Sequence, residues 1–415
     1  MNISVAIVMN LGAAVLLAQT LDVTPRRVLM DELAVIKASG LEPGERVTIR
    51  GRLTDGVDHA WASKAEFVAD EHGVVDVSKQ APASGSYKGI SAMGLIWSMM
   101  PETKDVKVYQ APKQLGAQMI RFELERKGGS AATAELEQIS MADGVRRVDL
   151  KGALHGALFE PTATGPHPGV LVLGGSEGGV PLKNAAWLAS HGYAALALAY
   201  FRYEDLPAQL EAIPLEYFGQ AVASMMKRPE IAPERIGVMG TSRGGELALQ
   251  LGSIYSQIKA VVAYVPASVR YPACCGDTRA PYAWTLGGRP LQFAMPRLGR
   301  GLDLQRESAI EVEKTSGPIL LISGEDDGVW PSSSMAGEVV SRLKLNHFTY
   351  HYEHLRYAHA GHRAGHPAIM PEWHGAIRHP VSGREIHWGG TPQGNAESSL
   401  DASPKVLDFL RQSLR

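Results

Sequence analysis

Residues 240–244, Gly-Thr-Ser-Arg-Gly, have the spacing G-x-S-x-G. Between a strand and a helix, this spacing holds a serine hydroxyl on a sharp turn, where the hydroxyl can act as a nucleophile. The flanks predict that context, because an apolar run (235–240) precedes the serine and apolar residues recur at helical spacing after it (245–251). The two glycines allow a tight turn and a close approach of strand and helix. We therefore predict that Ser242 is the nucleophile of an acyl-transfer reaction.

A serine hydroxyl needs a base that takes its proton and an acid that orients the base. Around a serine of this kind the acid comes first in the chain, directly after a later strand, and the histidine follows. The apolar run 318–324 predicts that strand, and Asp326 and Asp327 come after it. We favour Asp327 and keep Asp326 as the alternative, since an aspartate after a strand can instead cap the next turn.

The base should be a histidine on the loop after the last strand. Alternating residues predict a strand at 346–352, and His362 follows it in the chain. Nine of the 14 histidines lie in residues 347–387, so a metal site is the competing interpretation of this segment. No cysteine or clear carboxylate set accompanies His359, His362 and His366, and the H-E-x-x-H pattern is absent. We predict His362 as the base, no metal and no cofactor, and assign the other histidines to polar surface or pocket lining.

Acyl transfer also needs hydrogen-bond donors for the negative charge that develops on the carbonyl oxygen. The backbone N–H of Arg243, next to the nucleophile, is the first predicted donor of this oxyanion hole. We expect the second at Ser176 or its neighbours, in the glycine-rich loop 174–179 after the apolar run 169–173. Such a loop could instead bind phosphates, but the G-x-G-x-x-G spacing is not met and no Walker lysine follows.

The chain as a whole resembles the acyl-CoA thioesterase and bile acid-CoA:amino acid N-acyltransferase family. The resemblance covers nearly everything after about residue 20 and joins an uncommon pair of domains. It is carried by residues 187–201, 240–244, 324–327, 360–362, 388–390 and 409–410, and nearer the N-terminus by Ser86-Tyr87, residues 93–98 and Pro101. It implies the catalytic triad Ser242, Asp327 and His362, and acyl-CoA as the substrate class.

Two departures from the family pattern bear on function. Family members that conjugate acyl groups to amino acids resemble the thioesterases but have cysteine as the nucleophile, whereas this chain has Ser242. A thiolate gives a thioester intermediate suited to attack by an amine, while a serine ester more readily reacts with water, so hydrolysis is favoured. The region between His351 and Gly390 is long and rich in histidine, which bears on how the substrate fits and not on the triad.

The N-terminal part predicts an all-β domain over residues 21–145. The whole chain has 415 residues, which is long for one domain. Of these residues 45% are hydrophobic, enough for a substantial core. Strand-like segments bounded by turn residues lie at 46–50, 66–70 and 73–77. We predict an immunoglobulin-like sandwich that acts as a scaffold, with Trp97 in its core.

The C-terminal part, residues 146–415, predicts an α/β-hydrolase catalytic domain. Apolar strands alternate with helical patterns such as 207–226 and 332–343, which is typical of a mostly parallel sheet covered on both faces. Residues 267–316 interrupt this rhythm with prolines, aromatic residues and the adjacent Cys274 and Cys275. We predict a cap insertion over the active site, with a surface loop that does not contact substrate as the alternative. Neighbouring cysteines rarely form a disulfide without strain, so we expect these two to stay unpaired and predict no disulfide framework.

Charge and the N-terminus bear on partners and compartment. The chain has 41 basic and 43 acidic residues and no basic stripe, which favours a small-molecule acyl thioester or ester substrate and argues against nucleic acid. Residues 1–20 resemble the apolar core of a signal peptide but lack a basic start and a clean cleavage site, so an extra strand or a misassigned start codon is the alternative. Cleavage would mean export, which conflicts with CoA as an intracellular substrate, and retention would mean a cytoplasmic enzyme. The segment is too short for a stable membrane span, and the sequence leaves the oligomeric state open.

Three other functions compete with an acyl-CoA thioesterase. The first is a carboxylesterase or dienelactone-type hydrolase acting on esters that contain no CoA. The second is an acyl-CoA:amino acid N-acyltransferase. The third is a binding protein that uses its β domain for a partner while the hydrolase domain is a relic.

Overall fold

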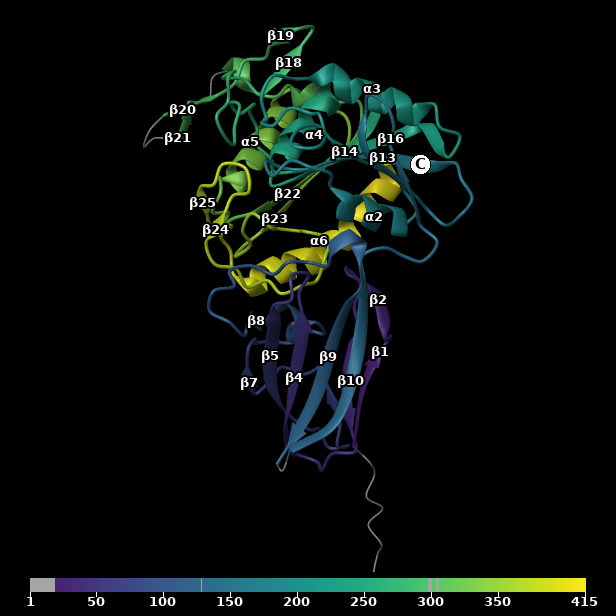
Figure 1. Ribbon diagram of the computed structural model, residues 1–415, viewed down its shortest axis with the longest axis vertical. Coiled ribbons are helices and arrows are strands. Elements are labelled where there is room, and N and C mark those ends of the chain that lie inside the picture. The colour runs from purple at the N-terminus through teal and green to yellow at the C-terminus, as the bar shows by residue number, and fades with distance from the viewer. Residues whose placement is uncertain (1–18, 128, 298–300, 304–305) are drawn as a thin grey trace, which may run out of the picture.

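The computed structural model describes residues 19–415 except 128, 298–300 and 304–305. The chain forms two stacked regions (Figure 1), an N-terminal region of strands and a C-terminal region in which helices surround a sheet. Most of the predicted leader lies outside the described residues, whereas Thr20 already begins a strand and pairs with Ser39. Within the described part of the chain, no helix is both long enough and apolar enough to span a bilayer.

The N-terminal region is built from two β-sheets with the orders β1-β3-β6 and β2-β10-β9-β4-β5-β7, and β8 pairs with β5. β2 joins β10 in parallel, and the other pairings of these sheets are antiparallel. The elements are β1 (Thr20–Thr24), β2 (Arg27–Leu29), β3 (Val35–Ser39), β4 (Arg46–Thr54), β5 (Ala60–Val68), β6 (Val75–Asp76), β7 (Ser84–Gly85), α1 (Gly94–Trp97), β8 (Met100–Pro101), the 3-10 helix η1 (Lys113–Leu115), β9 (Gln118–Arg126) and β10 (Gly129–Ile139).

Alternating burial along the strands explains why these sheets pack face to face. In β4, buried Val47 and Ile49 alternate with more exposed residues, and β9 repeats the pattern with buried Phe122. These side chains share one core with Val23 of β1 and Ile36 of β3, so the two sheets form a sandwich.

The predicted strands of this region are present with different ends. Residues 46–50 lie within β4 and 66–70 overlap the end of β5, but 73–77 contributes only the two residues of β6. Trp97 is 3% exposed and belongs to the core, as predicted.

The C-terminal region is an α/β structure around one eight-stranded sheet with the order β11-β12-β14-β13-β16-β17-β22-β23. The two pairings that involve β12 are antiparallel, and the strands from β14 to β23 are parallel. The elements are β11 (Arg146–Asp149), β12 (His155–Glu160), β13 (His167–Leu173), α2 (Leu182–Ser190), β14 (Ala194–Ala199), β15 (Ile213–Pro214), α3 (Leu215–Met226), β16 (Ile231–Thr241), α4 (Arg243–Ile254), β17 (Ile258–Tyr264), β18 (Trp284–Leu286), β19 (Arg289–Pro290), β20 (Met295–Arg297), β21 (Gly301–Asp303), η2 (Arg306–Ser308), η3 (Val312–Lys314), β22 (Ile319–Gly324), α5 (Ser332–Leu345), β23 (Tyr352–Tyr357), β24 (Ile377–Arg378), β25 (Glu385–Ile386) and α6 (Pro392–Ser413).

Helices cover both faces of this sheet because its central strands are apolar on both sides. β14 and β22 are buried along their whole length. Side chains of α3, α4 and α5 pack in the cluster on one face, and side chains of α2 and α6 pack in the cluster on the other. The parallel strands therefore all end at the same edge, where the loops that follow them meet.

Two predicted elements of this region need correction. The predicted helix 207–226 begins only at Leu215, because Ile213 pairs with Trp284 in a short parallel bridge of strands before it. The predicted strand 346–352 is wrong: α5 continues to Leu345, and the last strand of the large sheet is β23, which begins at Tyr352 opposite Ile319. The alternation over 346–352 was therefore a feature of a turn and not of a strand.

The segment 267–316 contains β18 to β21, η2 and η3, and it connects β17 to β22. The expectation that adjacent cysteines stay unpaired is wrong, because Cys274 and Cys275 form a disulfide. Cys275 has a φ of +81°, a left-handed backbone conformation that residues with a side chain seldom adopt.

The two regions are joined by α6 and by the segment that follows His362. α6 lies between the sandwich and the large sheet (Figure 1). The backbone N–H of Ile369 donates to the carbonyl of Met30 (2.7 Å), and that of Glu372 donates to the carbonyl of Trp97 (2.9 Å). Ile369 also packs in the core cluster of the sandwich. The N-terminal region thus supports the loop that carries the predicted base.

Candidate active site

The predicted nucleophile lies on a sharp turn between β16 and α4. Ser242 has φ +59° and ψ −118°, a conformation that a residue with a side chain seldom adopts. A Cβ added at Gly240 would lie 1.9 Å from the carbonyl oxygen of Gly244, and one added at Gly244 would lie 2.3 Å from that of Gly174. Only glycine fits at either position, which explains the spacing of the motif.

Three of the predicted side chains form one hydrogen-bonded chain. Ser242 Oγ lies 2.9 Å from His362 Nε2, and His362 Nδ1 lies 2.8 Å and 3.0 Å from the two carboxylate oxygens of Asp327. They come from the loops after β16, β22 and β23, at the carboxyl edge of the parallel strands. The side chains of His362 and Asp327 are 11% and 1% exposed.

The Asp327 carboxylate is held by the turn that follows β22. Its Oδ1 accepts from the backbone N–H of Val329 (2.9 Å) and of Trp330 (3.2 Å), and its Oδ2 accepts from Ser332 Oγ (2.6 Å). Asp326 faces elsewhere: its carboxylate lies 3.4 Å from Nδ1 of the exposed His359. The structure therefore brings Asp327, and not the alternative Asp326, to His362.

The first predicted oxyanion donor, Arg243, is the first residue of α4. Its backbone N–H therefore has no acceptor within the helix and can bind a ligand. Its side chain is buried, with Nε 3.3 Å from Glu246 Oε2 and the guanidinium 5.6 Å from the ring centre of Tyr271. Trp284 Nε1 donates to Glu246 Oε1 (2.7 Å). Burial raises the pKa of Glu246, and the positive charge of Arg243 partly opposes this rise.

The insertion reaches the site through aromatic residues. Tyr271 packs on Trp330 with ring centres 4.8 Å apart, and Trp330 packs edge-on against His362 at 5.7 Å. The sequence predicts aromatic residues in the insertion, but it predicts no contact between Trp284 and Glu246. The available signal was a glutamate within an apolar helical pattern, which needs a buried partner.

The loop that contains the second predicted donor lies beside the nucleophile. A Cβ added at Gly175 would lie 3.4 Å from Ser242 Cβ, so the loop that contains Ser176 runs along the serine. Ser176 Oγ lies 2.9 Å from Nε2 of His379. The backbone N–H of Gly175 donates to the carboxylate of Glu177 (3.3 Å). The sequence offered no signal for His379, because it lies 203 residues from Ser176.

The other histidines fall into different environments. His366 and His374 are partly buried, and burial lowers their pKa values to about 3 and about 4. His359 and His387 are mostly exposed. None of these residues lies in the hydrogen-bonded chain of Ser242.

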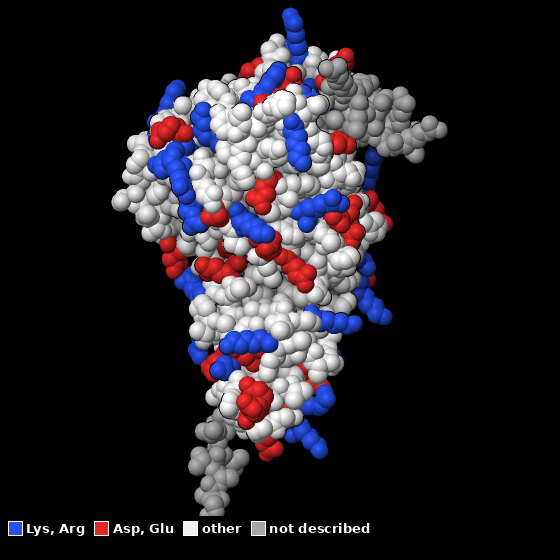
Figure 2. Space-filling model, turned by 180° about the vertical axis from the view of Figure 1, so that it is seen from behind, with Lys and Arg blue, Asp and Glu red and all other residues white. Residues whose placement is uncertain are grey.

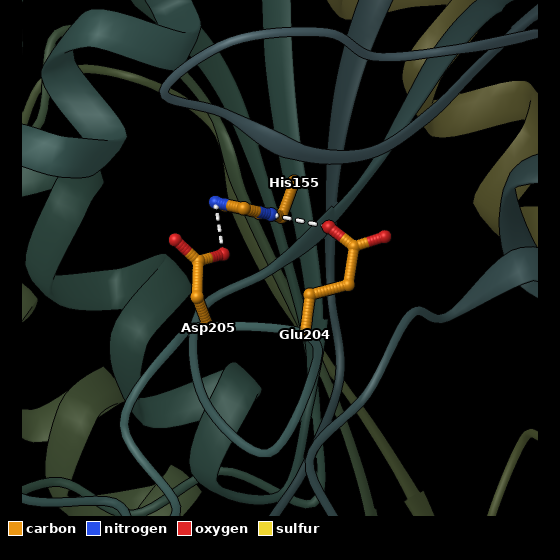
Figure 3. A group of neighbouring side chains, drawn as sticks. All are labelled: His155, Glu204 and Asp205. Carbon is orange, nitrogen blue, oxygen red and sulfur yellow. Dashed lines mark hydrogen bonds and ion pairs between the residues drawn. The ribbon is translucent and has the colours of Figure 1, made fainter.

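A cluster with metal-ligand residue types, His155, Glu204 and Asp205, lies elsewhere in the C-terminal region (Figure 3). Glu204 lies 2.7 Å from Nδ1 of His155, and Asp205 lies 3.3 Å from Nε2. The two ring nitrogens of one imidazole point in opposite directions and cannot both bind one ion. The arrangement fits one imidazole ring whose two nitrogens each face an exposed carboxylate.

Surface charge is mixed on the face seen in Figure 2. Acidic and basic side chains are interspersed there over both regions. This distribution agrees with the net charge of −2.

Two family models match this chain, one in its N-terminal part and one in its C-terminal part. Residues 31–152 match the acyl-CoA thioester hydrolase/BAAT N-terminal region, and residues 213–273 and 298–415 match the BAAT / acyl-CoA thioester hydrolase C terminal family. The chain belongs to this acyl-CoA thioester hydrolase/BAAT family.

Its relatives include enzymes of two kinds. Acyl-coenzyme A thioesterase 6 of Mus musculus is 32% identical over 96% of this chain and 97% of its own. Peroxisomal succinyl-coenzyme A thioesterase of the same species is 30% identical over 96% and 97%. Acyl-coenzyme A amino acid N-acyltransferase 1, also from Mus musculus, is 31% identical over 94% and 97%. Similarity alone thus does not separate hydrolysis from transfer to an amine.

Proposed function

We propose that this protein is a serine hydrolase that cleaves acyl-CoA thioesters through an acyl-enzyme. The observation that carries the proposal is the hydrogen-bonded chain Ser242–His362–Asp327 at the carboxyl edge of the sheet. Family membership and the similarity to thioesterases support the substrate class.

The proposed reaction follows from the geometry. Ser242 Oγ attacks the thioester carbonyl while His362 Nε2 takes its proton, and His362 then returns that proton to the leaving CoA sulfur. The backbone N–H of Arg243 stabilises the oxygen that becomes negative, together with a donor from the Ser176 loop. Water, deprotonated by His362, then attacks the acyl carbon, and as the bond to Ser242 Oγ breaks His362 returns that proton to Ser242, which frees the acid. Asp327 holds the ring with Nδ1 protonated and stabilises the imidazolium.

We also infer the finer fold and domain assignments. The antiparallel start of the large sheet, the parallel remainder and the serine turn after β16 support an α/β-hydrolase fold for residues 146–415. The two-sheet sandwich is compatible with an immunoglobulin-like domain over residues 21–145. The contacts of Tyr271 and Trp284 support residues 267–316 as the cap.

Transfer to an amine is the second candidate, because one relative is named an N-acyltransferase. The oxygen nucleophile Ser242 favours hydrolysis. Supplying glycine or taurine with acyl-CoA and analysing products by mass spectrometry separates the two, since only transfer gives conjugates.

Replacing the nucleophile tests the proposal. Ser242→Ala removes the attacking oxygen, so acyl-CoA turnover, followed as free CoA thiol, should fall roughly 10⁴- to 10⁶-fold. A fluorophosphonate probe should label the wild type at Ser242 and leave the variant unlabelled. Ser341→Ala, on the exposed side of α5, is the matched control and should keep full activity. A folded Ser242→Ala protein with near-normal turnover would refute the proposal.

A further inference from the structure

The turn between β24 and β25 holds His379 in one tautomer. The backbone N–H groups of Val381 and Ser382 both donate to its Nδ1, at 3.3 Å and 3.1 Å. A ring nitrogen that accepts hydrogen bonds carries no proton, so the proton of a neutral ring is on Nε2. Nε2 lies 2.9 Å from Ser176 Oγ and therefore donates to it.

The surroundings keep this ring uncharged at neutral pH. His379 is 8% exposed, and burial lowers its pKa. Of the charged groups that face it, Glu177 opposes this shift and Arg202 adds to it. The turn is closed by backbone hydrogen bonds between His379 and Arg384 (2.8 Å) and between Gly383 and His379 (2.9 Å), so the ring is fixed in place.

The hydrogen bond from His379 sets the direction of the Ser176 hydroxyl. Because Ser176 Oγ accepts from the ring, its own proton is available to donate to a different acceptor. A Cβ added at the preceding residue, Gly175, would lie 3.4 Å from the Cβ of Ser242, so Ser176 directly follows the residue that borders the nucleophile. Accepting one hydrogen bond also makes a hydroxyl a stronger donor of another.

We propose that Ser176 Oγ–H donates to the carbonyl oxygen of the bound acyl thioester, and that His379 is the positioning residue that orients this hydroxyl. The inference rests on the proposed function, because it assumes that Ser242 attacks that carbonyl. The hydroxyl complements the backbone N–H of Arg243, and its contribution grows as the oxygen becomes negative. The contact should therefore affect kcat more than KM.

The contacts from His379 to Ser176 and from Ser176 to the carbonyl oxygen form a hydrogen-bonded relay. A double-mutant cycle with an acyl-CoA substrate tests this relay. Ser176→Ala should lower kcat roughly 10²-fold, in line with the loss of one oxyanion donor, and change KM by less than about threefold. His379→Ala should lower kcat about tenfold. The double variant should lie within about threefold of Ser176→Ala alone, because His379 acts through that hydroxyl. The proposal would be overturned if the two losses of kcat multiplied in the double variant. An unchanged kcat in Ser176→Ala would also overturn it.

Two further variants test whether the loss of kcat in His379→Ala comes from the lost hydrogen-bond donor or from a disturbed structure. His379→Gln keeps an N–H that can donate to Ser176 and should retain at least about a third of the wild-type kcat by restoring that donor. His387→Ala, an exposed histidine just after β25, is the matched control and should leave kcat and KM unchanged. If His379→Gln falls as low as His379→Ala although both unfold at the wild-type temperature, the donor role of the ring is excluded.

The same experiment distinguishes this inference from the proposed function. A wild-type protein that hydrolyses no acyl-CoA would refute the proposed substrate. The relay would then be measured by the rate at which a fluorophosphonate labels Ser242, since its phosphoryl oxygen also gains negative charge. Active wild type with an unaffected Ser176→Ala variant would refute only the relay.

Discussion

At the residue scale, the site depends on two adjacent aspartates that have different environments. Asp327 contacts His362 Nδ1 and is 1% exposed, whereas Asp326 is paired with the exposed His359. The strand at 319–324 could be predicted from its apolar run, and with it the position of the acid to within one residue. The choice between the two depended on how the turn after β22 directs each carboxylate.

Substituting each aspartate separates their roles. Asp327→Asn keeps the size of the side chain but removes the charge that selects the Nδ1–H tautomer of His362, so kcat should fall about 10⁴-fold. Asp326→Asn is the matched control and should stay within about twofold of wild type, since its partner is exposed. Steady-state acyl-CoA hydrolysis measures both. Equal losses in the two variants would contradict the assignment of Asp327.

Ser242 and His362 could also be predicted, because chain order and local motifs specify them. His379 could not, since its tautomer and its contact with Ser176 arise from a turn that the chain forms far from residue 176. Residues that act through a neighbour leave no local pattern in the sequence.

At the element scale, α4 is linked to the insertion by a buried polar contact. Glu246 of α4 is fully buried and accepts from the indole N–H of Trp284 of β18. Because the Glu246 carboxylate lies out of water beside Arg243, each of its hydrogen bonds has a large effect on stability. The sequence predicted the existence of the insertion and of α5, but not the late start of α3 or the strand β23. Those ends depend on pairing with β18 and with β22.

Two tryptophan substitutions test this link. Trp284→Phe removes the donor to Glu246 and should lower the free energy of unfolding by about 1–3 kcal/mol more than Trp187→Phe does. Trp187 is the matched control, because it is also buried but its indole N–H has no hydrogen-bond partner in the described structure. Urea unfolding measures both values. Equal costs would show that the Trp284–Glu246 contact contributes little.

At the scale of the whole molecule, the sandwich supports the segment between His362 and α6. Arg363, next to the base, is paired with the buried Glu372 at 3.2 Å, and the Glu372 backbone is bonded to the sandwich at Trp97. The resemblance to a two-domain family predicted both regions. It did not predict that the histidine-rich segment helps α6 to join them, because that follows from long-range packing of residues such as Ile369.

Burial of histidines in this joining segment makes the stability of the molecule depend on pH. Burial lowers the pKa of His366 to about 3, and Arg363 and Lys183 add to the shift. In the unfolded chain the same ring has a pKa of about 6.5. Between about pH 6 and pH 4 the unfolded state therefore binds one more proton at this position, so the free energy of unfolding falls as the pH falls. His374, with a pKa of about 4, acts in the same direction.

Replacing His366 by a residue that does not titrate tests this dependence. His366→Gln should reduce the slope of unfolding free energy against pH by up to about 1.4 kcal/mol per pH unit between pH 6 and pH 4. Buried carboxylates such as Glu246 titrate equally in both proteins, so they do not affect this difference. His72→Gln, whose side chain is 77% exposed in the wild type, is the control and should leave the slope unchanged. Urea unfolding at each pH gives the slopes, and an unchanged slope in His366→Gln would show that this ring is protonated in the folded protein.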